Sequence, residues 1–309
     1  MLATIDTGSG RPVLLLHGQP GSKSSWAPLI DILAPRFRVL APDRPGYGET
    51  VGEAMGMAEN ADVVADFLRQ RGAAPATVVG HSWSGGVAVL LARRHPDTVR
   101  SLVLVGAVGT QDSVNRLDRL MVVPGIGDLL TVAALTGMGV ILPWIRVLMK
   151  RMGRGGQRSA SVPVERTGSP AGRLSPRVTM SARLRLYTAA ALPNEKMPDG
   201  WRGAWGRDRR TFLREQRALL AELSSVTAAL KEIRVPTSVV AGMWDMVVPP
   251  RAARSLTAAI PGAQLVAIPD TGHFIARDAS ALLAEVVVDT DRRADAEAVE
   301  EPEPQEQSE

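Results

Sequence analysis

Short runs of apolar residues alternate with longer stretches of helical periodicity along most of this 309-residue chain. Runs that are apolar throughout suit strands buried on both faces of a sheet, and helices between them predict parallel strands joined by right-handed crossovers. The expected strands are Val13–Leu16, Phe37–Ala41, Thr77–Gly80, Ser101–Gly106, Thr237–Ala241 and Gln264–Ile268. The expected helices are Ser25–Leu33, Met57–Arg71, Ser84–Arg94, Pro250–Ala259 and Ala276–Val287. The pattern therefore predicts an α/β fold.

The alternation stops near residue 110 and resumes near residue 232. We therefore expect one α/β domain, residues 1–110 and 232–288, interrupted by an insertion at residues 111–231. Within the insertion, residues 153–176 are dominated by Gly, Arg, Ser and Pro, a composition typical of a flexible loop. Residues 289–309 are acidic and polar and contain Pro302 and Pro304, which predicts a disordered tail.

The composition narrows the possible chemistry. A content of 45% hydrophobic and 22% charged residues is that of a globular protein and excludes disorder throughout. The chain contains no cysteine, which excludes disulfide scaffolds, thiolate zinc sites, iron–sulfur clusters and cysteine nucleophiles. Only four histidines are present, so histidine-based chemistry has few possible locations.

Charge is segregated along the chain although the net charge is only +4. Residues 146–217 hold 17 Lys and Arg against five Asp and Glu, whereas residues 289–309 hold nine acidic residues against two arginines. We therefore expect a nearly neutral body with a basic insertion and an acidic tail. The sequence pI near 9.9 does not by itself indicate nucleic-acid binding.

The segment Gly80-His-Ser-Trp-Ser84 carries the strongest chemical signal. Attack on a carbonyl needs a hydroxyl held in a sharp turn between a strand and a helix, with small neighbours that let the turn close. Ser82 lies two residues past the glycine that ends the strand, and we favour it as the nucleophile. Ser84 could centre the same turn in a shifted register and remains an alternative.

A serine nucleophile needs a general base, usually a histidine oriented by a carboxylate. His273 follows the last expected strand and Asp245 follows the strand before it, so both lie at the sheet edge where Ser82 is expected. The order serine, aspartate, histidine is that of α/β-hydrolase triads. Asp270 and Asp112 also follow strands and are alternatives for the acid.

Acyl transfer also needs donors directed at the developing oxyanion. The backbone N–H of Gln19, after the first expected strand, is one candidate, and that of Trp83, which follows the nucleophile, is the other. We interpret His17 and His81 as residues that structure their loops, and His95 as a surface residue at a helix end.

With these motifs the sequence resembles the α/β-hydrolase superfamily, in particular its capped branch of esterases, epoxide hydrolases, haloalkane dehalogenases and C–C bond hydrolases. The resemblance is carried by His17-Gly-Gln-Pro-Gly21, Asp43-Arg-Pro-Gly-Tyr-Gly48, Gly80-His-Ser-Trp-Ser-Gly85, Asp245 with Val248-Pro249, and Gly272-His273. It covers residues 1–110 and 232–288. It implies a mostly parallel central sheet with helices on both faces and an inserted helical cap.

Two features depart from the family pattern. Epoxide hydrolases and dehalogenases with a similar His-Gly-x-Pro segment carry aspartate where this chain has Ser82, and serine cannot form and release their alkyl-enzyme ester. Only Leu2–Thr7 is available for a strand ahead of Val13, so we expect the first strand of the family to be missing.

We therefore expect a serine hydrolase that cleaves an apolar carboxylic ester or a related acyl compound through an acyl-enzyme. The proposed catalytic residues are Ser82, His273 and Asp245, and no metal or organic cofactor is expected. The alternatives are a C–C bond hydrolase of diketone-like substrates, which the same triad can support, and a non-catalytic protein that binds a membrane or a partner.

In this family the insertion forms a lid over the site. Leu129–Ile145 is a 17-residue stretch without charge, followed by Arg146, Lys150 and Arg151. Glycines and a proline interrupt it, so we expect lid helices lining an apolar pocket. A peripheral contact with an anionic membrane through the basic flank is the alternative. No nucleic-acid motif is present, and the N-terminus lacks a signal pattern, so we expect a cytoplasmic protein.

Overall fold

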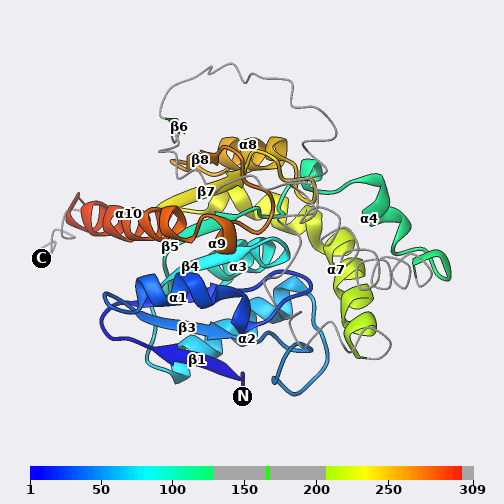
Figure 1. Cartoon of the computed structure of the whole chain (residues 1–309), viewed down its shortest axis with the longest axis horizontal. Helices are drawn as coiled ribbons and strands as arrows, with labels where there is room; N and C mark the ends of the chain where they lie inside the picture. Colours follow the sequence, from blue (N-terminus) through cyan, green and yellow to red (C-terminus); the bar gives the residue numbers. More distant parts are fainter. Residues whose placement is uncertain (128–164, 168–206, 301–309) are drawn as a thin grey trace, which may run out of the picture.

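The computed structural model describes residues 1–127, 165–167 and 207–300, and its centre is an eight-stranded sheet (Figure 1). The strand order is β1-β3-β2-β4-β5-β7-β8-β6. The strands are β1 (Thr4–Thr7), β2 (Pro12–Leu16), β3 (Arg38–Pro42), β4 (Ala76–His81), β5 (Val99–Val105), β6 (Glu165–Thr167), β7 (Thr237–Gly242) and β8 (Gln264–Ile268). From β3 to β8 along this order all neighbours run parallel, whereas β1 and β6 are antiparallel edge strands. The predicted mostly parallel sheet is confirmed, with each predicted strand in place.

The segment ahead of β2 contains one strand that the apolar pattern did not predict. Thr4–Thr7 pairs with β3 in a register that sets Thr4 opposite Pro42 and Thr7 opposite Val39. A strand of four residues is too short for a hydrophobic pattern to reveal it in the sequence.

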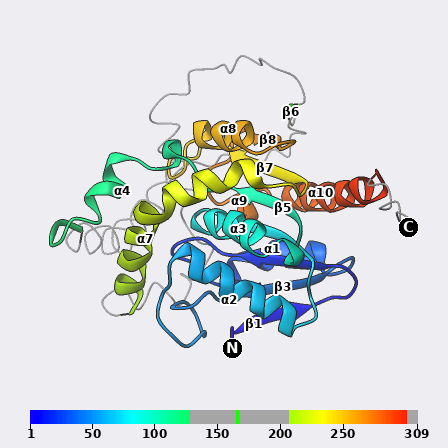
Figure 2. The same cartoon turned by 180° about the vertical axis from the view of Figure 1, so that it is seen from behind.

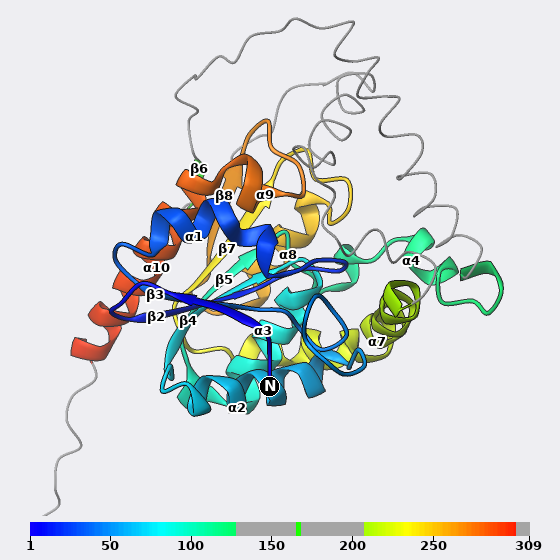
Figure 3. The same ribbon diagram turned by 60° about the horizontal axis from the view of Figure 1, so that its bottom comes forward.

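The described helices cover both faces of the sheet. The α-helices are α1 (Ala27–Leu33), α2 (Met57–Gln70), α3 (Trp83–Arg94), α4 (Arg116–Leu120), α7 (Arg207–Ala229), α8 (Pro250–Ala259), α9 (Ile275–Asp278) and α10 (Ser280–Glu300). Short 3₁₀ turns occupy Lys23–Trp26, Pro96–Thr98, Gln111–Ser113 and Leu230–Glu232. Helices α1, α9 and α10 pack on one face, and α2, α3, α7 and α8 pack on the other (Figures 2 and 3).

Alternation along the strands divides the core between these two layers. Leu14 and Leu16 of β2 belong to the cluster under α2, α3 and α7, whereas Val13 and Leu15 belong to the cluster under α1 and α10. Successive side chains of a strand point to opposite faces, so a fully apolar run supplies both layers at once. The candidate site lies at the carboxyl ends of these buried strands.

The insertion is shorter than the predicted range 111–231, because α7 belongs to the α/β body. Leu223, Val226 and Ala229 of this helix are almost fully buried and join the same core cluster as α2 and α3. Their spacing of three residues places them on one face of the helix, so the C-terminal half of α7 is an ordinary covering helix of the sheet. Serine, threonine and alanine separate these residues, and the charged residues of α7 all lie within residues 207–222.

The predicted disorder of the tail is wrong for residues 289–300, which continue helix α10. Asp291 is fully buried and Ala294 is 8% exposed, so this part of the helix packs on the body. Alanine, arginine and glutamate are good helix formers, and arginines of the body neutralise the buried acid. Residues 301–309 lie outside the described residues.

Several expectations for the insertion also lie outside the described residues. These include the uncharged stretch Leu129–Ile145, its basic flank, and all but residues 165–167 of the predicted loop 153–176. Residues 165–167 form β6, which pairs with β8. In the described part of the chain no helix is both long and apolar enough to cross a membrane.

Candidate active site

Ser82 lies in the turn between β4 and α3, in a backbone conformation that residues other than glycine rarely adopt. Its φ is 55° and its ψ is −120°. Such a conformation costs about 1–3 kcal/mol and persists only where the surroundings enforce it. Here the N–H of Ser82 donates to Val105 O at 2.9 Å, and Ser82 O accepts from Gly85 at 2.9 Å and Val108 at 3.1 Å. The turn is therefore held from both sides.

The glycines of this segment let the turn close. A Cβ on Gly80 would lie 2.6 Å from Ser84 O, and one on Gly85 would lie 2.3 Å from the Cβ of Ala107. Ser84 itself is inside α3, fully buried, and donates to His17 O at 2.5 Å. The serine at the strained turn is thus Ser82, and the shifted register centred on Ser84 is not adopted.

The structure brings Ser82, His273 and Asp245 into one hydrogen-bonded line. His273 Nε2 lies 3.0 Å from Ser82 Oγ, and His273 Nδ1 lies 2.7 Å from Asp245 Oδ2. The three residues are only 5–7% exposed. Asp245 follows β7 and His273 follows β8, so parallel strands deliver all three side chains to the same sheet edge.

The carboxylate of Asp245 is fixed by its own loop. Its Oδ1 accepts the N–H groups of Val247 at 2.8 Å and Val248 at 2.9 Å, which leaves Oδ2 for His273. The two alternative acids lie elsewhere. Asp112 accepts from Ser255 Oγ, and Asp270 is exposed.

Gly106, at the end of β5, supports this arrangement and was not singled out from the sequence. It has a φ of +49°, and a Cβ there would lie 3.2 Å from Asp245 Oδ2 and 3.3 Å from His273 Nδ1. A larger residue would press on the hydrogen bond between the two. The sequence did offer a signal for Gly106, since a glycine ends the buried strand next to the strand that carries Ser82.

Both candidate oxyanion donors lie beside Ser82. Trp83 is the first residue of α3, where the backbone N–H groups have no partner within the helix. The loop before Gln19 runs against the nucleophile, since a Cβ on Gly18 would lie 3.0 Å from the Cβ of Ser82. The two donors therefore come from separate loops that meet at the serine.

The other histidines near the site structure their loops. His17 Nδ1 donates to Gly18 O at 2.9 Å, and its Nε2 accepts the N–H of Arg44 at 3.0 Å. His81 Nε2 donates to His273 O at 3.0 Å. Burial, with the nearby Arg44 charge, lowers the pKa of His17 to about 3, and burial together with His273 lowers the pKa of His81 to about 3. Both rings are neutral near pH 7. His95 lies away from them, 2.7 Å from Asp62.

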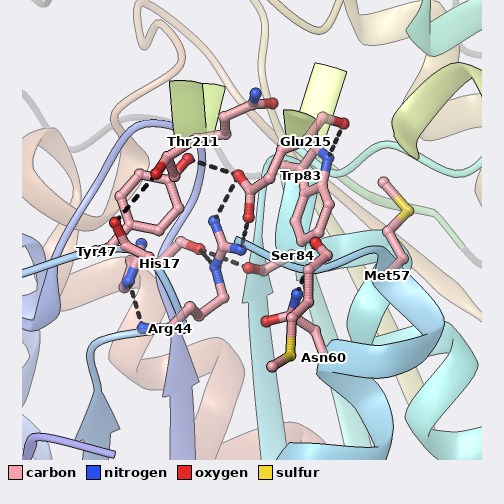
Figure 4. A network of polar contacts seen from close by, with 12 residues as sticks. His17, Arg44, Tyr47, Met57, Asn60, Trp83, Ser84, Thr211 and Glu215 are labelled. Carbon is pink, nitrogen blue, oxygen red and sulfur yellow. Dashed lines mark hydrogen bonds and ion pairs between the residues drawn. The ribbon is translucent and has the colours of Figure 1, made fainter. Parts of the chain in front are cut away.

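A buried ion pair next to the site was missed from the sequence (Figure 4). Arg44 and Glu215 are both fully buried and paired through two contacts, and Tyr47 donates to Glu215 Oε2 at 2.6 Å. Burial raises the pKa of Glu215, although Arg44 and Tyr47 oppose the shift. Arg44 and Tyr47 belong to a quoted motif, but Glu215 lies in a helix rich in charged residues and carries no signal of its own.

A parallel sheet with a strained serine between a strand and a helix, followed by an acid and a histidine after two later strands, defines the α/β enzymes that have a nucleophile elbow. The comparison with protein families agrees. The chain belongs to the alpha/beta hydrolase family, whose model matches residues 13–286.

Several known proteins are similar to this chain. An uncharacterized protein of Mycobacterium tuberculosis is 30% identical over 285 residues, which cover 91% of this chain and 75% of that protein. A 2-hydroxymuconate semialdehyde hydrolase of a Pseudomonas species is 38% identical over 111 residues, 34% of this chain and 39% of the hydrolase. A thermophilic esterase from Thermogutta terrifontis has the same fold, with a TM-score of 0.59 and 22% identity over 95% of this chain and 93% of the esterase.

Proposed function

We propose that this protein is a serine hydrolase that cleaves an apolar carboxylic ester or a related acyl compound through an acyl-enzyme. The observation that carries the proposal is the hydrogen-bonded line from Ser82 Oγ through His273 to Asp245. Because Ser82 is held in a strained turn and His273 bonds it through Nε2, the hydroxyl has a general base in place before substrate binds.

The proposed reaction has two halves. Ser82 Oγ attacks the carbonyl carbon while His273 Nε2 takes its proton, and Asp245 stabilises the resulting imidazolium. The Gln19 and Trp83 N–H groups bind the oxyanion, and His273 then protonates the leaving alcohol. Water activated by His273 releases the acid and restores the serine. The reaction requires no metal or organic cofactor.

Apolar side chains beside the triad support an apolar substrate. Met246, Val247 and Phe274 are 56%, 39% and 38% exposed, although large apolar residues are usually buried. Each lies within two residues of Asp245 or His273 in the chain, so we expect them to border the bound substrate. An acyl or alkoxy chain bound there would cover them.

Hydrolysis of a series of p-nitrophenyl esters with acyl chains of two to twelve carbons tests the proposal. We expect a burst of p-nitrophenol equivalent to one site per chain, and loss of turnover by about 10⁴-fold in Ser82→Ala and in Asp245→Asn. Asp270→Asn is the matched control, because it removes an exposed acid three residues from His273. It should keep wild-type turnover. Equal activity in the wild type and Ser82→Ala would contradict the proposal.

C–C bond hydrolysis of a diketone-like substrate is the second candidate. The observation that favours it is the 38% identity to the Pseudomonas 2-hydroxymuconate semialdehyde hydrolase. The same panel separates the two candidates when a vinylogous 1,5-diketone is included. Turnover of the diketone without a p-nitrophenol burst would select the second candidate.

A further inference from the structure

One turn of α7 contacts both loops that carry the candidate oxyanion donors. The side-chain Nε2 of Gln19 donates to Phe212 O at 2.7 Å, and the indole Nε1 of Trp83 donates to Glu215 O at 3.1 Å. These contacts span 193 and 132 residues of sequence. Helix α7 therefore contacts directly the two residues whose backbone N–H groups are the candidate oxyanion donors.

The side chain of Glu215 extends the connection through Arg44 (Figure 4). Glu215 binds Nη1 and Nη2 of Arg44, the latter at 3.2 Å. The guanidinium then donates from Nε to His17 O and from Nη2 to Gly18 O, both at 3.1 Å. It is further confined between the rings of Tyr47 at 4.8 Å and Trp83 at 4.5 Å.

The bond to Gly18 O matters because this oxygen belongs to the same peptide group as the N–H of Gln19. A peptide group is planar and trans, so fixing its C=O fixes the direction of its N–H. Arg44 Nη2 and His17 Nδ1 both donate to this one carbonyl, at 3.1 Å and 2.9 Å. Donation to the oxygen also polarises the group and makes the N–H a better donor.

Burial makes this arrangement stiff. The side chains of Arg44 and Glu215 are fully buried. A buried charge that loses its partner is strongly unfavourable, so the guanidinium keeps one orientation as long as Glu215 is ionised and in place. The planar fork of arginine, unlike the ammonium of lysine, can serve the carboxylate and two carbonyls together.

We propose that Glu215 is a positioning residue for both oxyanion donors. Through Arg44 it orients the Gly18–Gln19 peptide, and through its own backbone carbonyl it holds the indole of Trp83. This inference rests on the proposed function, since it assumes that the two N–H groups bind an oxyanion.

Two variants test the connection. Glu215→Gln keeps the shape but removes the charge that orients Arg44, and Arg44→Lys keeps the charge but removes the fork. With p-nitrophenyl butyrate we expect kcat to fall about 10- to 100-fold in both, below the loss from deleting a donor outright, while KM changes less than about 3-fold. The affinity of butylboronic acid, which forms a tetrahedral adduct on the serine, should fall by the same factor as kcat.

Asp291→Asn is the matched control for lost stability. Asp291 is also a buried acid bound by arginine, but it contacts Thr77 at the opposite end of β4, about 16 Å from Ser82 at the usual rise per strand residue. We expect it to lower the melting temperature while kcat and boronate affinity stay at the wild-type values. Wild-type kcat and boronate affinity in folded Glu215→Gln and Arg44→Lys would overturn the inference, as would losses matched by Asp291→Asn.

A readout independent of turnover separates this inference from the proposed function. The ¹⁵N resonance of the Gln19 amide reports on hydrogen bonds to the carbonyl of the same peptide group. It should shift in Glu215→Gln and Arg44→Lys and stay in place in Asp291→Asn. An unchanged resonance in the first two overturns the positioning role. If the resonance shifts in these two variants but the wild type hydrolyses no acyl substrate, the contact network is supported and the proposed function is contradicted.

Discussion

Two neutral imidazoles are built into the loops around Ser82. His17 serves as both donor and acceptor between the Gly18 and Arg44 backbones, and His81 donates to the backbone of His273. Protonation of His17 would place a charge beside the buried Arg44 and abolish the acceptor for its N–H. The contact of His17 with the Arg44 N–H is therefore intact only when the His17 ring is uncharged.

These histidines predict a loss of stability in mild acid. Their pKa values are about 3 in the folded chain and near 6.5 when unfolded. Between pH 6.5 and pH 4.5 the unfolded chain binds more protons, so the free energy of unfolding falls as the pH falls. The slope should approach about 1.4 kcal/mol per pH unit for each histidine, and the raised pKa values of the Glu215 and Asp118 carboxyls oppose it.

Urea unfolding measured at intervals from pH 7 to pH 4.5 checks this prediction. A His81→Gln variant keeps a donor for His273 O and should lower the slope by about half. The paired carboxylates Asp6, Asp43 and Asp62 have lowered pKa values, so their contribution is lost mainly below this range. A free energy of unfolding that is constant or rises toward pH 4.5 would show that the two rings are not held neutral.

At the residue scale, catalytic residues could be predicted from the sequence where they directly follow a strand. Ser82, Asp245 and His273 each follow a recognisable buried strand, so their meeting could be predicted from the order of parallel strands. Glu215 could not be predicted. It faces Arg44 across 171 residues of sequence, and a glutamate in a charged helix looks the same whether it faces solvent or a buried guanidinium.

At the scale of elements, two helices differ from what the sequence predicted. Helix α7 completes the core beside α2 and α3, and α10 extends through residues that were expected to be disordered. In α10 the buried group is itself an acid. Asp291 accepts from Arg11 at 2.5 Å, Thr77 at 2.9 Å and Arg100 at 3.2 Å.

This packing predicts unequal effects of two neighbouring acids. Asp291→Ala should lower the free energy of unfolding by about 2–4 kcal/mol, since it leaves arginines and a buried hydroxyl without their shared acceptor. Asp295 contacts the same arginines, but its side chain is 50% exposed, so Asp295→Ala should cost less than about 1 kcal/mol. Chemical denaturation of both variants at pH 7 measures the difference. Similar small effects would mean that the second half of α10 does not pack on the body.

At the scale of the whole molecule, the parallel sheet, its layers and the side of the sheet that carries the site were predictable. Fully apolar strands and helices between them leave few other ways to bury both faces. The secondary structure of the insertion could not be predicted, because residues 146–217 combine positive charge with glycine and proline and show no sustained periodicity. Contact of this basic segment with an anionic membrane stays a prediction, as does the cytoplasmic location.

Covalent labelling with a fluorophosphonate, followed by proteolysis and mass spectrometry, tests the central claim most directly. The reagent reacts with a serine hydroxyl only where a general base and oxyanion donors activate it. We predict one modified site in the folded wild type, on Ser82, and no modification in Ser82→Ala or after unfolding. Modification of Ser84 instead, or no modification of folded protein, would contradict the assignment of Ser82 as the nucleophile.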